Sequence, residues 1–410
     1  MYIATSRTSN PAPAAGRGPA LRRVSANVVA LGMVSLVTDI SSEMVTAVLP
    51  LYLVLGLGLN PLQFGLLDGL YSGATAVVRV LGGHLADRWR RLKAVAGFGY
   101  GLSAVCKLGL LAAGSSVAAI GVVLAADRTG KGLRTGPRDA LISLSSEPAT
   151  LGRSFGVHRA LDTVGAFLGP LAAMAVLALS LGSYPSVFFT SFCIAAVAVL
   201  LLVLFVRDRP GVVDRAAVSP RAAVNLLRQR DFRRVASWAA LLGLVTVGDS
   251  FVYLVLQRRW EVAATYFPLL PLGTAGVYLL LAVPIGRLAD RFGRWRVFLA
   301  GHVALGAALV VICGPVSGPG LAVLALGLHG VFYAATDGVL MAAAGPLVPA
   351  GLRATGLAVV QTGQAAARML SSVLFGLAWT LWDLRPAVLV AAGALTVVVL
   401  AAAVVRPVRP

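Results

Sequence analysis

The sequence predicts an all-α integral membrane protein with twelve transmembrane helices in two six-helix bundles. Hydrophobic residues make up 58% of its 410 residues and charged residues only 12%, whereas soluble domains carry about 25% charged residues. Apolar runs of roughly 20 residues, long enough to cross a hydrocarbon core, recur from end to end. One short loop occurs twice, about 200 residues apart. The chain is therefore expected to hold two parallel repeats, related by an axis along the membrane normal.

Apolar runs, helix breakers and loop charges predict the spans in order. In the first half they lie at about 27–56, 61–86, 93–114, 116–142, 154–181 and 184–206. In the second half they lie at about 235–257, 264–288, 295–315, 320–345, 353–381 and 386–405. The predicted domains are a tail (1–24), a first bundle (25–206), a basic linker (207–234), a second bundle (235–405) and a C-terminal tail (406–410). Residues 1–24 lack an apolar core, so we interpret them as a disordered cytoplasmic tail rather than a signal peptide.

The formal net charge of +19 is interpreted as a signal of membrane topology. Lys and Arg concentrate in alternate loops and in the linker, and Arg258, Arg259 and Arg385 are the few exceptions on the other side. This alternation follows the positive-inside rule and predicts a multi-pass protein of the inner (plasma) membrane with both termini in the cytoplasm. The bilayer is the expected partner of the basic linker, and nucleic acid is not. Each chain carries both halves, so a monomer is expected.

The duplicated loop is a candidate gate. It reads Gly83-His-Leu-Ala-Asp87-Arg88-Trp-Arg90-Arg91 in the first half and Gly286-Arg-Leu-Ala-Asp290-Arg291-Phe-Gly293-Arg294 in the second. An aspartate here can accept hydrogen bonds from a helix N-terminus or an arginine, and such a contact must break when the cytoplasmic side opens. The alternative is a loop that merely obeys the positive-inside rule.

With this loop the chain resembles a twelve-helix member of the major facilitator superfamily across nearly its whole length, although Arg90 stands where that loop usually has a glycine. Two further motifs carry the resemblance. Arg128-x-x-x-Gly132 resembles the motif whose arginine is linked to proton transfer in drug/proton antiporters, and Gly165-Ala-Phe-Leu-Gly169-Pro170 resembles the helix-five motif of the exporters. The stretch 127–139 also resembles a poorly characterised prokaryotic branch. The resemblance implies two rocking halves, a gating role for the loop, and export.

Each motif also has a structural interpretation. Arg128 lies ~18 Å from the outer end of its span at 1.5 Å per residue, where a lone charge costs at least ~2.5–3.5 kcal/mol. Its side chain is therefore expected to face a cavity or a carboxylate, such as that of Asp127. Gly165 and Gly169 make a flat face for helix packing, and Pro170 bends the helix.

Ionisable residues inside the predicted spans are candidates for proton coupling. Asp39 and Glu43 are four residues apart on one helix face, so the two acids are expected to titrate as a unit. His158 and Asp162 have the same spacing and form a candidate relay. Permanent pairing of the acids with a buried base is the alternative. Candidates for the substrate pathway are Asp68, Lys107, Asp249, His329, Tyr333, Asp337 and Arg368.

The sequence contains no Gly-x-x-x-x-Gly-Lys-Ser/Thr loop for ATP and no His-Glu-x-x-His metal motif. An enzyme is therefore not expected, and a proton gradient rather than a cofactor is the expected energy source. The sequence predicts a secondary active transporter that exports a small amphipathic compound or metabolite in exchange for protons. The alternatives are a proton-coupled importer of a small nutrient, a transport-dead membrane sensor and, least favoured, a membrane enzyme acting on lipid.

Overall fold

The computed structural model describes residues 24–73, 91–147, 150–208, 225–314, 318–349 and 352–405, and helices are the only regular elements within these ranges. Ten described helical stretches are long and apolar enough to span a membrane. Helix α4 is equally long but carries more charges, and the helix at 61–73 ends where the described range ends. These elements confirm the predicted all-α membrane fold. Gly83, Asp87 and Arg88 of the first candidate gate lie outside the described residues.

The helices of the first half closely follow the predicted spans. They are α1 (Ala26–Leu51, extended by a π-helical turn, Tyr52–Gly56), the helix at 61–73, α3 (Leu92–Ala112), α4 (Val117–Leu144), α5 (Leu151–Leu179) and α6 (Tyr184–Phe205). Ser116 and Ser183 cap α4 and α6, because their side chains accept hydrogen bonds from backbone N–H groups of the first turn. Helix α1 packs on α5 and α6, and α3 packs on α4.

The second half consists of α8 (Arg230–Val245), α9 (Asp249–Trp260), α10 (Leu269–Phe292), α11 (Arg294–Cys313), α12 (Pro319–Thr336), α13 (Val339–Ala344), α14 (Arg353–Trp382) and α15 (Leu384–Val405). Two spans that we predicted as continuous, 235–257 and 320–345, are broken. The first is interrupted where the backbone of Thr246 and Gly248 becomes extended. The second is interrupted at Gly338, whose φ of 75° suits a residue without a Cβ atom.

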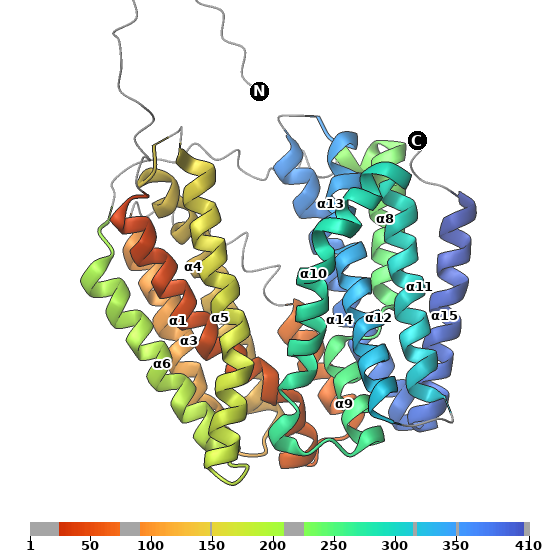
Figure 1. Cartoon of the computed structure of the whole chain (residues 1–410), viewed down its shortest axis with the longest axis horizontal. Coiled ribbons are helices and arrows are strands. Elements are labelled where there is room, and N and C mark those ends of the chain that lie inside the picture. Colours follow the sequence, from red (N-terminus) through yellow and green to blue (C-terminus); the bar gives the residue numbers. More distant parts are fainter. Residues whose placement is uncertain are drawn as a thin grey trace, which may run out of the picture.

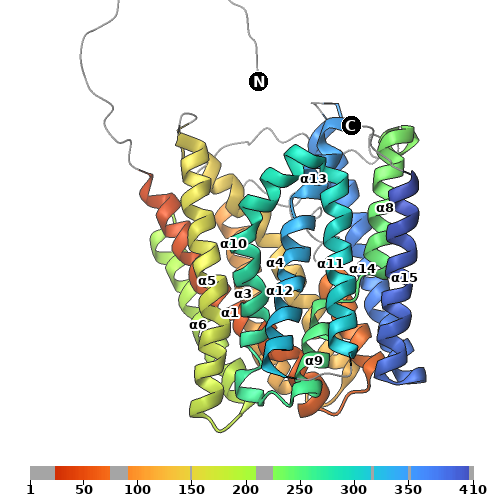
Figure 2. The same ribbon diagram turned by 45° about the vertical axis from the view of Figure 1, so that its right-hand side comes forward.

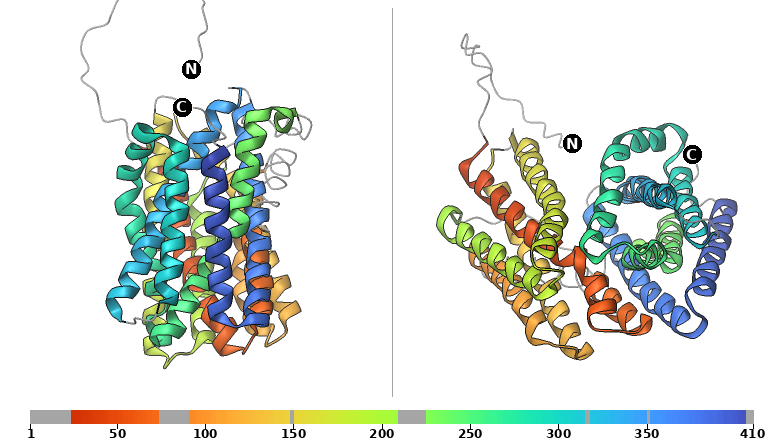
Figure 3. Two further views of the ribbon diagram at one scale, coloured as in Figure 1. Left: turned by 90° about the vertical axis from the view of Figure 1, so that its right-hand side faces the viewer. Right: turned by 60° about the horizontal axis from the view of Figure 1, so that its bottom comes forward.

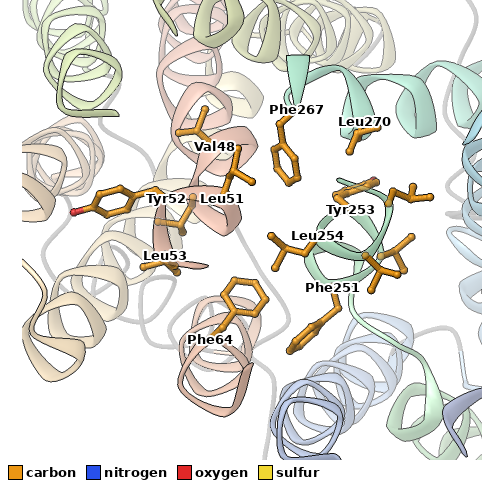
Figure 4. Close-up of a cluster of buried hydrophobic side chains, with 14 of the residues drawn as sticks. Val48, Leu51, Tyr52, Leu53, Phe64, Phe251, Tyr253, Leu254, Phe267 and Leu270 are labelled. Atoms are coloured by element: carbon orange, nitrogen blue, oxygen red, sulfur yellow. The ribbon is translucent and has the colours of Figure 1, made fainter. Parts of the chain in front are cut away.

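The two bundles stand side by side and approach each other at one end only (Figures 1, 2 and 3). We call this the closed end. There a single hydrophobic core joins both halves, and Phe64 of the first half meets Phe251 of the second with ring centroids 4.9 Å apart (Figure 4). At the opposite end, where α1 begins and α15 ends, each half has a separate core. We call this the basic end, since Arg91, Lys93 and the second copy of the duplicated loop lie there.

Candidate functional site

The helix-five glycines lie directly against the predicted acids of α1. A Cβ atom at Gly165 would lie 2.5 Å from the carbonyl oxygen of Leu36 and 3.1 Å from the Cβ of Asp39. A Cβ atom at Gly169 would lie 2.6 Å from the Cβ of Glu43. Only residues without side chains allow this approach of α1 and α5. Pro170 follows, buried within α5.

This close approach brings an acid of α5 to Asp39. The carboxyl groups of Asp39 and Asp162 interact with each other, and a hydrogen bond between two carboxyl groups requires a proton on one of them. Asp162 also lies 3.9 Å from Arg138 and 3.5 Å from Arg159. We predicted a pair within α1, whereas the structure pairs Asp39 across to α5. Glu43 instead faces the basic side chains of α4.

A line of buried polar side chains extends along α5 from this pair toward the basic end. Ser154, His158 and Asp162 follow one another at intervals of four residues and so share one helix face. Ser154 and His158 are each only 1% exposed. The Ser154 hydroxyl, both ring nitrogens of His158 and Oδ1 of Asp162 are buried without a hydrogen-bond partner. Buried polar groups of this kind are usually satisfied by water.

Arg128 forms an ion pair inside the first bundle. Its guanidinium lies 2.5 Å from Oδ2 of Asp127 and 3.9 Å above the ring of Tyr71. Asp127 also accepts a hydrogen bond of 2.8 Å from Ser103, and Nζ of Lys107 lies 3.8 Å from its Oδ1. The carboxylate that we expected opposite Arg128 is thus its chain neighbour. Lys107 belongs to this cluster and does not line the central cavity, so its place on the substrate pathway stays a prediction.

Our sequence analysis missed a row of basic residues along α4. Arg128, Lys131, Arg134 and Arg138 recur every three or four residues and therefore lie along one side of the helix. Arg134 stacks over Tyr100 at 4.7 Å, and Arg138 donates to the hydroxyl of Ser35 on α1. The helical spacing of these residues was the signal that could have revealed the row.

A polar cavity of about 270 Å³ lies between the halves. It is lined by Asp68, Ser72, Thr246, Val247, Gly248, Asp249, Ser250, Gln361, Gln364, Ala365, Arg368 and Ser372. Asp68 accepts a hydrogen bond of 2.7 Å from Ser372 and has no ion-pair partner among the described residues. Nε of Arg368 is buried without a hydrogen-bond partner. The structure thus brings three predicted pathway residues together, and adds the hydroxyl and amide groups that sequence analysis missed.

Asp249 lines the cavity and contacts two residues of α12, which lie behind it. His329 Nε2 lies 3.3 Å from Asp249 Oδ1, and the hydroxyl of Tyr333 donates a hydrogen bond to Oδ2. Asp249 is the first residue of α9, so the helix break places it at the cavity. The other acid predicted for the pathway in this half, Asp337, lies at the break after α12 and accepts a hydrogen bond of 3.0 Å from Tyr278. Asp249, His329 and Tyr333 form one network, and Asp337 lies outside it.

The second candidate gate makes its polar contacts within its own half. Arg294 lies 3.0 Å from Asp290 and donates to the backbone carbonyl of Ala342 after α12. Gly286 has open space around it, and Arg291 lies over the ring of Phe292. In the first copy, Arg91 is the residue immediately before α3.

The segment 152–156 has the Gly-x-Ser-x-Gly spacing of a hydrolase nucleophile elbow, which requires a strand–turn–helix. Here the segment lies in the regular helix α5, and Ser154 is buried. It therefore supplies no exposed nucleophile.

Comparison with known proteins identifies the family. The sequence profile of the Major Facilitator Superfamily matches residues 31–278 and 263–410. An uncharacterized MFS-type transporter of Methanocaldococcus jannaschii is 29% identical over 368 residues, covering 87% of this chain and 89% of that protein. An uncharacterized protein of Mycobacterium tuberculosis is 29% identical over 381 residues, and the match covers 91% of this chain and 89% of that protein.

Solved transporters share the fold. The nucleoside transporter NupG superposes with a TM-score of 0.79 at 16% identity, and the match covers 93% of this chain and 100% of the NupG chain. A mutant of a peptide transporter, POT, superposes with a TM-score of 0.77 at 16% identity, covering 93% and 94%. These likenesses concern the fold alone, whereas the profile covers nearly the whole sequence. The chain is a transporter of the Major Facilitator Superfamily, from a poorly characterised prokaryotic branch.

Proposed function

We propose that this transporter exports a small amphipathic compound or metabolite in exchange for protons, as a monomer in the plasma membrane. The basic end faces the cytoplasm in this proposal, since Lys and Arg favour that side. The conformation with a shared core at the closed end is then inward-facing. Export requires the reverse arrangement as well, with the halves joined at the basic end and apart at the closed end.

The observation that supports proton coupling is the close packing of Gly165 on Asp39, which brings the Asp162 side of α5 to Asp39. A carboxyl pair that shares a proton at a helix–helix contact binds it with an affinity that depends on the distance between the helices. Coupling needs this difference, because a proton shifts the conformational equilibrium only if it binds the two states unequally. Ser154 and His158 supply a route for the proton between this pair and the basic end, with water filling the space between them.

The direction rests on the helix-five motif, whose resemblance is to exporters. The lining of the central cavity keeps an importer of a small polar nutrient as a second candidate. Asp68, Arg368 and Gln364 present charged and hydrogen-bonding groups there, which suit a hydrophilic substrate. The two candidates differ in the sign of proton movement when substrate enters a vesicle.

The experiment uses proteoliposomes with an acidic interior, a trapped pH-sensitive dye and a panel of fluorescent amphipathic compounds added outside. An antiporter releases protons as the compound enters, so the internal pH rises. A symporter carries protons inward in vesicles without a gradient, so the internal pH falls. We expect Asp162→Asn to abolish the proton signal, whereas Asp383→Asn, the same change at an exposed loop position, behaves as wild type. Full coupling in Asp162→Asn would contradict the proposal.

A further inference from the structure

The second copy of the duplicated loop lines a cavity of about 700 Å³ at the basic end, which shares no lining residue with the central cavity. The ends of three membrane helices, α10, α11 and α15, line this cavity together with α13 and the turn that follows it. Its lining residues are Ala289, Asp290, Arg291, Phe292, Gly293, Arg294, Trp295, Arg296, Leu299, Ala343, Pro346, Leu347 and Ala403. The cavity thus lies at the level where the predicted spans leave the membrane.

The charges of this cavity are unbalanced. Three arginines line it, Arg291, Arg294 and Arg296, against a single acid, Asp290. Asp290 forms an ion pair with Arg294, and Nη2 of Arg294 lies 3.0 Å from Oδ1 of Asp290. The described residues give neither Arg291 nor Arg296 a carboxylate partner, and both side chains are exposed. Two guanidinium groups are therefore free to bind an anion, and phosphate oxygens suit their donor geometry.

The rest of the lining is apolar. Leu299, Leu347 and Ala403 contribute hydrocarbon surface, and the ring of Phe292 remains 52% exposed beside Arg291. A free phosphate ion would use the arginines and leave this surface unoccupied. A phospholipid uses both parts, because its headgroup carries the charge and its glycerol and upper acyl chains are apolar. The chain's own last residues, 406–410, carry arginines and no acid, so their charge does not complement the cavity.

We propose that this cavity binds the phosphate headgroup of an anionic phospholipid from the cytoplasmic leaflet. Arg291 and Arg296 hold the phosphate, and the apolar wall receives the glycerol and the first part of an acyl chain. Basic pockets at the cytoplasmic side of membrane helices are a recurrent form of lipid site. The proposal depends on the orientation with the basic end in the cytoplasm, and not on the direction of transport or on proton coupling.

The test measures lipid retained by the full-length protein in mild detergent, using native mass spectrometry with titrated phosphatidylglycerol, phosphatidylcholine or inorganic phosphate. Each arginine contact with an anionic headgroup contributes about 5.5-fold in affinity, so Arg291→Gln with Arg296→Gln should weaken phosphatidylglycerol binding about 30-fold. Arg230→Gln with Arg233→Gln removes the same charge from exposed positions on α8 at the same end, and should change binding little. Ala403→Trp fills the cavity without altering charge and should also displace the lipid.

Three outcomes would overturn the proposal. Equal lipid binding by the two double variants would show that charge at this end acts without a specific site. The double variant Arg291→Gln with Arg296→Gln could lose phosphatidylglycerol binding while Ala403→Trp keeps it in full. That result would place the lipid on the surface rather than in the cavity. Displacement of phosphatidylglycerol by equimolar inorganic phosphate would assign the arginines to a soluble anion. Circular dichroism of each variant verifies that the helices are intact.

Discussion

Replacing Gly169 by alanine tests whether the helix-five motif sets the distance between α1 and α5. The new Cβ atom would lie 2.6 Å from the Cβ of Glu43 and 2.9 Å from the carbonyl oxygen of Ile40. Ordinary contacts begin near 3.4 Å, so α5 must retreat from α1 by nearly an ångström. Backbone atoms cannot rotate away as a side chain can. Overpacking of this kind costs about 1–3 kcal/mol.

The matched control is Gly393→Ala, on the lipid-exposed helix α15, where a Cβ atom has nothing within 4 Å. Both variants gain the higher helix propensity of alanine, worth up to about 1 kcal/mol. The difference between them therefore isolates the helix contact, and we expect Gly169→Ala to be about 1–3 kcal/mol less stable than Gly393→Ala. Reversible unfolding in mixed micelles, followed by circular dichroism, measures this difference.

The same variant should weaken proton coupling, since separation of α1 from α5 also separates Asp39 from Asp162. Proton flux in proteoliposomes is therefore expected to fall in Gly169→Ala and to be unchanged in Gly393→Ala. Equal stability and equal flux in the two variants would refute the argument that the glycines hold the acids in contact.

Three further predictions follow from the described contacts. Cysteines at Leu62 and Thr380, where a backbone N–H of the first half donates to a hydroxyl of the second, should be joined by a short bis-methanethiosulfonate cross-linker, which attaches through reducible disulfides, in a background without native cysteines. Transport should then stop and return on reduction, whereas undiminished transport in the cross-linked protein would argue against opening at this end. Arg128→Ala should lower the free energy of unfolding by about 3–5 kcal/mol in a chemical-unfolding assay. The double variant Arg128→Gln with Asp127→Asn should recover part of this loss. Unchanged stability in Arg128→Ala would show that the ion pair is dispensable. Ser154→Ala should slow proton-driven flux without altering the compound concentration at half-maximal rate, and an unchanged rate would exclude the hydroxyl from the proton route.

Helix positions were predictable from the sequence because the thickness of the bilayer fixes the length of an apolar span. The two helix breaks were not, although each lies beside a glycine and an aspartate, at Gly248–Asp249 and Asp337–Gly338. A span interrupted for two or three residues keeps its overall hydrophobicity, so a composition-based argument joins the parts. Asp249 was a pathway candidate as an ionisable residue inside a predicted span, but the helix break that positions it at the cavity was not predicted.

The partners of the buried charges were harder to predict than their existence. Asp39 and Glu43 share a helix face, so sequence spacing favoured their pairing. The structure instead gives Asp39 a partner on α5, because the glycines at 165 and 169 bring that helix close. Lys107 was a pathway candidate as an ionisable residue inside a predicted span, and its partner Asp127 lies on a different helix. Helix rotation and crossing decide such contacts, and neither is encoded in the spacing along one helix.

The distribution of polar contacts bears on how the halves can exchange between two conformations. The ion pairs described above all join residues of the same half. Between the halves, the helix at 61–73 meets α14 through glycines, and the described polar contacts there are hydroxyl hydrogen bonds, from Leu62 to Thr380 and from Ser372 to Asp68. Breaking a buried ion pair by removing a partner costs about 3–5 kcal/mol, whereas a hydrogen bond contributes about 0.5–1.5 kcal/mol, or up to about 3 kcal/mol with a charged partner. Strong electrostatic contacts thus lie within each bundle, and weaker ones join the bundles. Alternating access requires this ordering, because the closed end must open repeatedly while each bundle stays folded.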